Sequence, residues 1–241
     1  MNYFLYIIFG LGPSIAWLAF YLRKDVHPEP KKMLLKVFFY GMLAALVALL
    51  LEVGIFQEFN KLPISLFSIT ILNVFIGVAL VEEVLKFLVV QEKVLTSPEF
   101  DEPVDAMIYM ITAAMGFAAL ENLLILWSPM FSYSLMETAL LSGFRFIGAT
   151  FLHVLCSGTV GYFLAISFFG GKRKNSPTIF GAKAPGNKWL TLVGLGIAVA
   201  LHGFYNFSIM MGEGGQKFIL PFIILLGSAL FVSFGFRRLK E

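Results

Sequence analysis

The stretch VALVEEVLKF at residues 78–87 places charged side chains in the middle of a long apolar segment. That segment, residues 65–92, is rich in Leu, Ile, Val and Phe, which is typical of a helix that crosses a lipid bilayer. On such a helix Glu82 lies one turn before Lys86 on the same face, and Glu83 meets Lys86 at a spacing of three residues. Ionisable groups in hydrocarbon are costly unless they face protein or water. The stretch therefore predicts a membrane helix with a functional position on it, or else a structural ion pair.

The composition of the whole chain points the same way. Apolar residues make up 59% of the 241 residues, 27 residues are Phe, and only 14% are charged. A soluble domain of this size is less apolar. The net charge of +3 comes from basic clusters between apolar runs, which lipid orientation explains without a nucleic-acid partner. The single cysteine, Cys156, excludes an internal disulfide and a cysteine-based zinc site.

About seven stretches are long enough to cross the membrane, because a span needs roughly 20 apolar residues. They lie near residues 3–22, 33–55, 65–92, 104–127, 138–169, 188–211 and 218–236. We predict an all-α, polytopic transmembrane helix bundle that forms a single domain over residues 1–241, with its functional motifs within residues 65–211. The first span lacks a basic leader and a small-residue cleavage site, so it reads as a retained helix.

The charges of the connecting segments predict the orientation, because Lys and Arg are retained on the cytoplasmic side. One side would carry Arg23, Lys24, Lys31, Lys32, Lys36, Lys93, Lys172, Arg173, Lys174, Lys183, Lys188, Arg237, Arg238 and Lys240. The other side would carry only Lys61 and Lys217. We therefore expect a multi-pass protein of a prokaryotic cell membrane with its N-terminus outside and its C-terminus in the cytoplasm.

Further polar residues lie in the later spans. The fourth span contains GFAALEN, which places Phe117 and Glu121 one turn apart and adds Asn122. A buried carboxylate and amide either form part of a site or cross-link helices. The fifth span holds Arg145, near the outer surface, which can reach the interface or pair with Glu121. It also holds His153, and a single membrane histidine is often only a packing residue.

The sixth span contains HGFYN, in which His202 and Asn206 present an imidazole and an amide to one side. The depth of each residue in the membrane tests whether the polar side chains of the different spans can meet. At about 1.5 Å per residue from the cytoplasmic ends, Glu82 lies at roughly 15 Å, Glu121 at 25 Å, His153 at 24 Å and His202 at 21 Å. Ordinary tilts of membrane helices are large enough to account for these differences in depth, so the sequence predicts that the four side chains converge.

Such a set of groups suits hydrolysis of a peptide bond, which needs a base, an oxyanion stabiliser and water. In one version, without a metal, a glutamate deprotonates water while His202 and Asn206 bind the oxyanion. In the other, His153, His202 and Glu121 bind Zn²⁺, which lowers the pKa of a bound water while the remaining glutamate acts as base. The sequence leaves both versions open. It contains no H-E-x-x-H, G-x-S-x-G or phosphate-loop motif.

Taken in order, these motifs resemble the PrsW-type intramembrane proteases, relatives of the CAAX prenyl endopeptidases and of the scaffold subunit of γ-secretase. The resemblance rests on Asp25 with Pro28, Glu29 and Pro30, on E-E-x-x-K at Glu82, Glu83 and Lys86, on F-x-x-x-E-N at Phe117, Glu121 and Asn122, on His153, and on H-x-x-x-N at His202 and Asn206. It implies a membrane-embedded endopeptidase that cuts a membrane-bound protein. In the namesake branch this is the first cut in an anti-sigma factor.

By the same resemblance, Glu82 would be the general base with Glu83 in support, and His202 and Asn206 would form the oxyanion hole. Glu121 and Lys86 stand where the prenyl endopeptidases have His and Arg, which argues against a prenylated substrate. A glutamate cannot donate as an imidazole does, and His153 is the available replacement. Lys86, Phe117, Asn122 and Arg145 would have supporting roles.

Two alternatives to a protease remain at this stage. A non-catalytic scaffold would use the same polar residues only to hold the bundle together. A proton-coupled transporter would use Glu and His as a relay, although the chain lacks the paired, broken spans typical of such proteins. The sequence does not identify a substrate-binding site or an oligomeric state.

Overall fold

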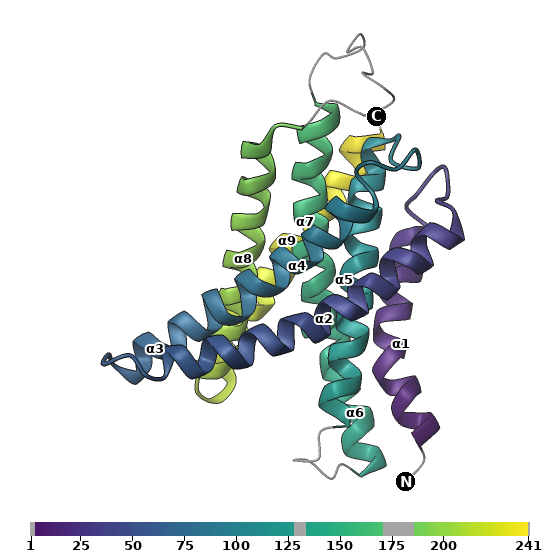
Figure 1. Cartoon of the computed structure of the whole chain (residues 1–241). Helices are drawn as coiled ribbons and strands as arrows, with labels where there is room; N and C mark the ends of the chain where they lie inside the picture. The colour runs from purple at the N-terminus through teal and green to yellow at the C-terminus, as the bar shows by residue number, and fades with distance from the viewer. Residues whose placement is uncertain (1–2, 128–133, 171–185, 241) are drawn as a thin grey trace.

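A computed structural model describes residues 3–127, 134–170 and 186–240 as a bundle of helices (Figure 1). The helices are α1 (Tyr3–Leu22), α2 (Lys31–Phe59), α3 (Leu66–Leu72), η1 (Asn73–Leu80), α4 (Val81–Lys93), α5 (Pro103–Leu126), α6 (Leu135–Ile147), α7 (Ala149–Phe169), α8 (Lys188–Met211), η2 (Gly214–Phe218) and α9 (Ile219–Lys240). Among the described residues, seven helical segments are long and apolar enough to span a membrane. The predicted all-α bundle of about seven spans is therefore confirmed.

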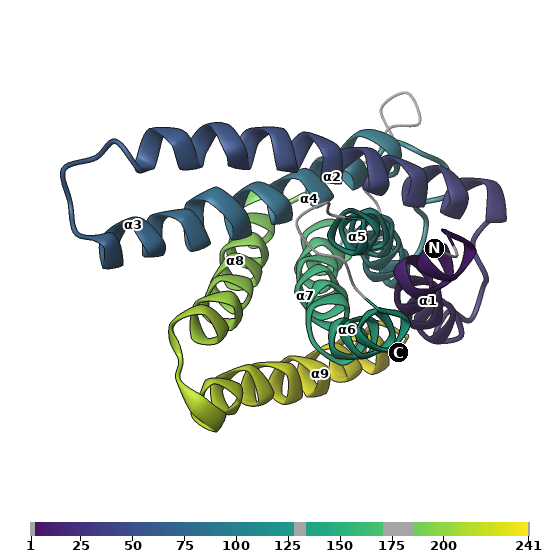
Figure 2. The ribbon, with the colours of Figure 1, turned by 90° about the horizontal axis from the view of Figure 1, so that it is seen from below.

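Helix α5 forms the centre of the bundle (Figure 2). Of its most apolar window, 78% is buried inside the protein, against 28% for the spans formed by α1, α2, α3 to α4, and α9. Those outer spans expose large apolar side chains such as Leu50 and Phe222. Exposed apolar side chains on long helices suit contact with lipid, where they cost nothing. The exposure pattern therefore supports insertion of the whole bundle in a membrane.

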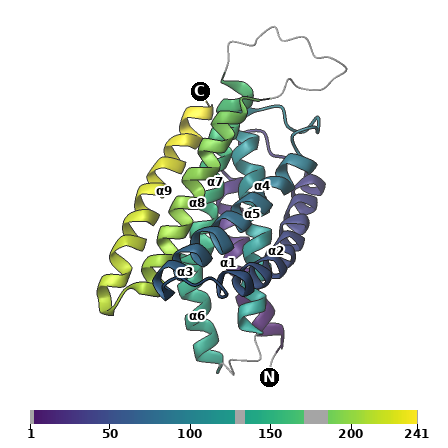
Figure 3. The ribbon, with the colours of Figure 1, turned by 60° about the vertical axis from the view of Figure 1, so that its left-hand side comes forward.

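Helices α5 and α7 stand upright, whereas α2 and the continuous helix from α3 through α4 cross them at a strong tilt (Figure 1). Helices α8 and α9 lie side by side along one flank (Figure 3). The loops after α1 and α4 and the end of α9 lie on one side of the bundle (Figure 1). These are the segments that the charge pattern assigned to the cytoplasm. Which side faces the cytoplasm stays a prediction, and Lys172, Arg173, Lys174 and Lys183 lie outside the described residues.

The third span departs from the ordinary α-helix expected for it. Residues Asn73–Leu80 form a π-helix that ends two residues before Glu82. The wider turn changes the rotational position of everything that follows it on the helix, and such turns are frequent at functional sites. The π-helical segment thus helps set the direction in which Glu82, Glu83 and Lys86 point into the bundle.

The fifth span is also not one continuous helix. It breaks at Gly148, where α6 ends and α7 begins, with φ −94° and ψ −98°. A Cβ atom at this position would lie 2.5 Å from the Tyr205 hydroxyl and 2.9 Å from the Phe144 carbonyl oxygen. The glycine therefore permits α8 to approach the break closely. The apolar run of the fifth span gives no indication of this contact, because Tyr205 belongs to a different helix.

Candidate active site

The site lies where α4, α5, α7 and α8 meet, and it is organised around a buried lysine. The Lys86 ammonium donates hydrogen bonds to Glu82 Oε2 at 3.1 Å, to Glu83 Oε1 at 2.8 Å and to His153 Nδ1 at 2.8 Å. Lys86 is fully buried, and its ammonium lies 4.5 Å from the centre of the Phe117 ring. The spacing argument for Glu82, Glu83 and Lys86 is confirmed. All three N–H donors of the ammonium are used.

His153 links this group to the acidic residue of α5. An ammonium has no acceptor, so the Nδ1 atom of His153 must accept the bond from Lys86. The Nε2 atom then carries the proton and donates to Glu121 Oε2 at 2.9 Å. Both ring nitrogens are thus engaged. His153 holds Glu121 and Lys86 in fixed positions relative to each other.

His202 contacts the other glutamate of α4. Its Nδ1 atom lies 2.9 Å from Glu83 Oε1, and its ring lies edge-on to the His153 ring with 5.3 Å between centroids. No described group makes a hydrogen bond to His202 Nε2. The predicted convergence of Glu82, Glu121, His153 and His202 is therefore confirmed. His202 keeps one ring nitrogen for a substrate or a metal.

The two glutamates of α4 differ in accessibility. The Glu83 side chain is fully buried, and its Oε2 atom has no hydrogen-bond partner. The Glu82 side chain is 7% exposed. Only its Oε2 atom is bound, to Lys86. Of the two, Glu82 is therefore the carboxylate that has an exposed edge and an oxygen without a protein partner, whereas Glu83 holds Lys86 and His202.

A second group of polar residues comes from α5, α6 and the first turn of α7. The Arg145 guanidinium pairs with Glu121, with 3.0 Å between Nη2 and Oε1, and its Nε atom donates to Asn122 Oδ1. The Asn122 amide donates in turn to the Thr150 hydroxyl at 3.2 Å. Of the two roles expected for Arg145, pairing with Glu121 is the one observed. The network fixes Glu121 from the side opposite His153.

Asn206 lies one turn beyond His202 on α8 and faces a cavity of about 730 Å³. Arg145 and Tyr205 also line this cavity, and its walls are otherwise mainly apolar side chains of α6, α8 and α9. Of the predicted site residues, Asn206 and Arg145 line this cavity.

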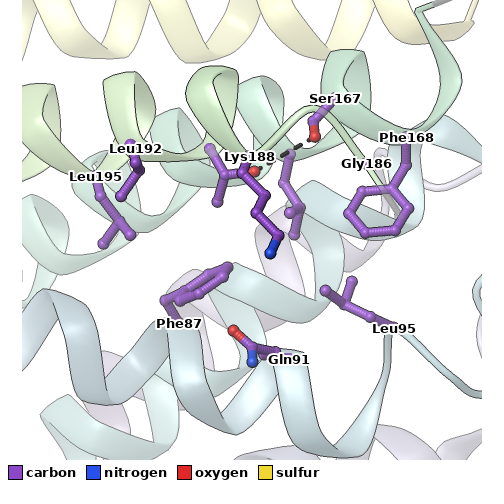
Figure 4. A pocket seen from close by; sticks show the side chains of 11 residues that line it. Phe87, Gln91, Leu95, Ser167, Phe168, Gly186, Lys188, Leu192 and Leu195 are labelled. Carbon is purple, nitrogen blue, oxygen red and sulfur yellow. Dashed lines mark hydrogen bonds between the residues drawn. The ribbon is translucent and has the colours of Figure 1, made fainter.

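Another cavity, of about 410 Å³, lies between the ends of α4, α7 and α8 (Figure 4). Lys188 points into it toward Phe87 and Gln91, and Ser167 lies at its upper edge (Figure 4). The described residues that line it include no carboxylate and no histidine. It therefore lacks the groups that hydrolysis needs.

The donor set suits a metal ion. Glu82, Glu83, His153 and His202 each offer one ligand atom, and these atoms lie within 4.8 Å of one another. Imidazole nitrogens with carboxylate oxygens are a set that Zn²⁺ accepts, and the unpartnered Glu83 Oε2 is a buried oxygen that lacks a donor or a cation. Two of the predicted ligands, His153 and His202, belong to this set, whereas Glu121 bonds to the far side of the His153 ring. The Lys86 ammonium bonds to three of the same residues, so a metal would have to displace it from His153 Nδ1, whose single lone pair accepts its hydrogen bond.

Sequence reasoning missed two residues here. Glu52 of α2 is half-buried within electrostatic range of Glu82, Glu121 and Lys86. The rule that flags charges inside apolar spans would have found it in LLLEVG at residues 49–54. The Tyr205 hydroxyl lies against Gly148, and no local pattern signals that contact.

Comparison with known proteins places this chain in a family. Residues 29–234 match the family described as PrsW family intramembrane metalloprotease. The Oceanobacillus iheyensis protein named Protease PrsW is 29% identical over 220 residues, which cover 90% of this chain and 88% of that protein. The Bacillus subtilis protein of the same name is 28% identical over 233 residues, which cover 96% and 93%. No solved structure matches the chain at a significant level. The chain belongs to the PrsW family of intramembrane metalloproteases, as its motifs predicted.

Proposed function

We propose that this protease hydrolyses a peptide bond of a membrane-anchored protein of the anti-sigma factor kind, with Glu82 as the base that activates water. The observation that carries the proposal is the buried meeting of Glu82, Glu83, His153 and His202 from three spans of the bundle. The substrate class rests on the likeness to proteins named Protease PrsW over most of the chain. Members of this family act on membrane-bound substrates.

In the proposed reaction, Glu82 takes a proton from water as the water oxygen attacks the carbonyl carbon of the substrate. Of the two α4 glutamates, Glu82 has a side-chain oxygen without a protein partner and some exposure. Glu83 accepts from Lys86 and holds His202 by Nδ1. The carbon–nitrogen bond then breaks, and the proton passes to the leaving nitrogen.

Asn206 and the imidazolium form of His202 would stabilise the negative oxygen that forms during attack, because His202 Nδ1 donates to Glu83 and Nε2 carries a second proton only in that form. The Nε2 atom of His202 is not used by the protein, and Asn206 faces the cavity of about 730 Å³. We assign that cavity to the substrate segment, because its mainly apolar walls suit a transmembrane peptide. Lys86, Phe117, Glu121, Asn122, His153 and Arg145 would act as positioning residues, since they hold one another and the α4 glutamates in place.

A bound Zn²⁺ would be held by Glu83, His153 and His202 of the donor set described above, which leaves Glu82 as the base. When bound, it would supply a water of lowered pKa and an electrophile for the carbonyl oxygen. The protein residues would still exclude bulk water, orient the substrate and carry the proton. The binding of the metal and the identity of the base are separate questions, and each has its own measurement.

The proposal is tested by reconstituting the protein in liposomes with a single-span substrate and measuring cleavage. Glu82→Gln is expected to lower the rate at least about hundredfold, because it removes the base while keeping the shape. Glu58→Gln is the matched control, since Glu58 is 71% exposed on α2 and pairs only with Lys61. Wild-type cleavage by folded Glu82→Gln and Glu83→Gln variants would exclude the assigned roles. Bound zinc, measured before and after chelation and readdition, separates the metal-dependent version from the metal-free one.

A further inference from the structure

The ends of the first and last spans form a basic cavity that the proteolytic site does not use. The cavity has a volume of about 290 Å³ and is lined by Phe20, Tyr21, Lys24, Ser233, Phe236, Arg237 and Lys240. It lies on the side of the bundle where the loop after α1 and the end of α9 are found (Figure 1). No residue of the glutamate and histidine cluster lines it. It is therefore a separate site.

Three cations surround this cavity without a protein counter-ion. Within the described parts of the chain, no carboxylate pairs with Lys24, Arg237 or Lys240. The Lys24 ammonium lies 5.0 Å from the centre of the Phe20 ring, a contact that leaves its N–H donors available. Three cations around one small space repel one another, so they favour an anion between them.

The cavity also offers neutral donors. The Tyr21 hydroxyl makes no hydrogen bond to any described residue, although Tyr21 is only 4% exposed. Ser233 adds a second hydroxyl at the exposed rim. Cationic and hydroxyl donors in one concave site match the several acceptor oxygens of a phosphate group.

The residues around the cavity and its level in the membrane indicate that the phosphate belongs to a lipid headgroup. The Tyr21 and Phe236 rings form an apolar floor with 5.5 Å between centroids, and Phe20 is 46% exposed toward the lipid side. The cavity lies at the ends of two membrane spans, which is the level at which lipid headgroups lie. Basic pockets between helices at this level bind anionic headgroups.

We propose that this cavity binds the headgroup of an anionic phospholipid, which bridges the ends of α1 and α9. The retention of basic residues on one side of the membrane explains why such residues lie here at all. It does not explain why three of them line one cavity together with the hydroxyl of Tyr21, which makes no hydrogen bond to a described residue. The bridging lipid stabilises the bundle against separation of its first and last spans.

The test is native mass spectrometry of the full-length protein with phosphatidylglycerol or phosphatidylcholine as the probe. The triple variant K24Q/R237Q/K240Q is compared with K31Q/K32Q/K36Q, which removes three exposed cations of the same side from outside the cavity. Wild type and the control triple variant are expected to retain phosphatidylglycerol. The cavity variant is expected to bind it at least about tenfold more weakly.

A conservative variant, K24R/R237K/K240R, keeps the charges and is expected to keep the lipid. Phosphatidylglycerol is also expected to raise the melting temperature of wild type and of the control triple variant, but not of the cavity variant. Equal binding of phosphatidylglycerol by both triple variants would overturn the proposal, as would equal binding of phosphatidylcholine and phosphatidylglycerol by wild type. Stabilisation by inorganic phosphate to the same extent would assign the cavity to a soluble phosphate instead.

Discussion

At the scale of single residues, the site depends on how Lys86 is neutralised. Its ammonium is buried among carboxylates and a neutral imidazole and has no contact with solvent. A buried charge is tolerated only when it is paired and hydrogen-bonded. The same ammonium fixes Glu82, Glu83 and His153 relative to one another, so the stability and the geometry of the site have one common cause.

Replacement of Lys86 by Gln is expected to lower the free energy of unfolding by about 3–5 kcal/mol, because it leaves buried carboxylates without their cation. The double variant E83Q/K86Q removes one of those carboxylates, so its loss should be smaller than the sum of the single losses. Denaturant unfolding in detergent measures both values. Lys61→Gln, which breaks only an exposed pair with Glu58, should unfold almost as wild type does. A K86Q variant as stable as wild type would contradict this account.

At the scale of elements, packing in this bundle depends on close crossings and docked loops. Helices α2 and α5 cross so closely at Gly41 that an added Cβ atom would lie 2.1 Å from the Ala113 carbonyl oxygen. The loop between α1 and α2 is fixed to α5, because the Tyr109 hydroxyl donates to Glu29 Oε2 at 2.5 Å. These contacts position α5, which carries Glu121.

Gly41→Ala is expected to destabilise the protein by about 1–3 kcal/mol. The added methyl group would meet the main chain of Ala113, which cannot move aside as a flexible side chain can. Gly54→Ala on the same helix is the control, since nothing lies within 4 Å of its added Cβ. That change should be neutral or slightly stabilising, as alanine favours the helix. Unfolding of both variants, followed by circular dichroism, checks the difference. Equal stability of the two would show that α2 and α5 are not held at this crossing.

The contact between Glu29 and Tyr109 is expected to make the stability of the folded protein depend on pH. Burial raises the pKa of Glu29 to about 8, and Asp25 and Asp105 nearby oppose its ionisation further. Because the folded protein then holds a proton that the unfolded chain releases near pH 4.5, the stability from this group should be full below pH 4.5, fall between pH 4.5 and about 8, and level off above that. Melting temperatures across this range test the effect. Glu29→Gln should remove much of the slope, and an unchanged slope in that variant would exclude Glu29 as its source.

At the scale of the whole molecule, the charge pattern and the arrangement of the helices agree. The described segments expected on the cytoplasmic side lie together at one end of the bundle (Figure 1). Cys156 is fully buried and is the single cysteine of the chain. The natural protein is therefore suited to accessibility labelling.

Lys61→Cys should react with a membrane-impermeant maleimide on intact cells, because the loop after α2 is expected to face outward. Lys31→Cys should react only after the membrane is permeabilised, since it lies at the start of α2 on the opposite side. Cys156 supplies no background, as its sulfur is buried. The reverse labelling pattern would invert the predicted orientation.

The sequence by itself determined the membrane class, the approximate spans and the residues of the site. Length and apolar content specify spans locally, and charges such as Glu82 or His202 stand out against an apolar background. The tertiary structure decided what depends on contacts between spans. It showed that Lys86 is shared by three partners, that Glu83 is fully buried while the Glu82 side chain is 7% exposed, and that Glu52 approaches the site from α2. The π-helical turn and the break at Gly148 also follow from neighbouring helices, which periodicity along one helix cannot report.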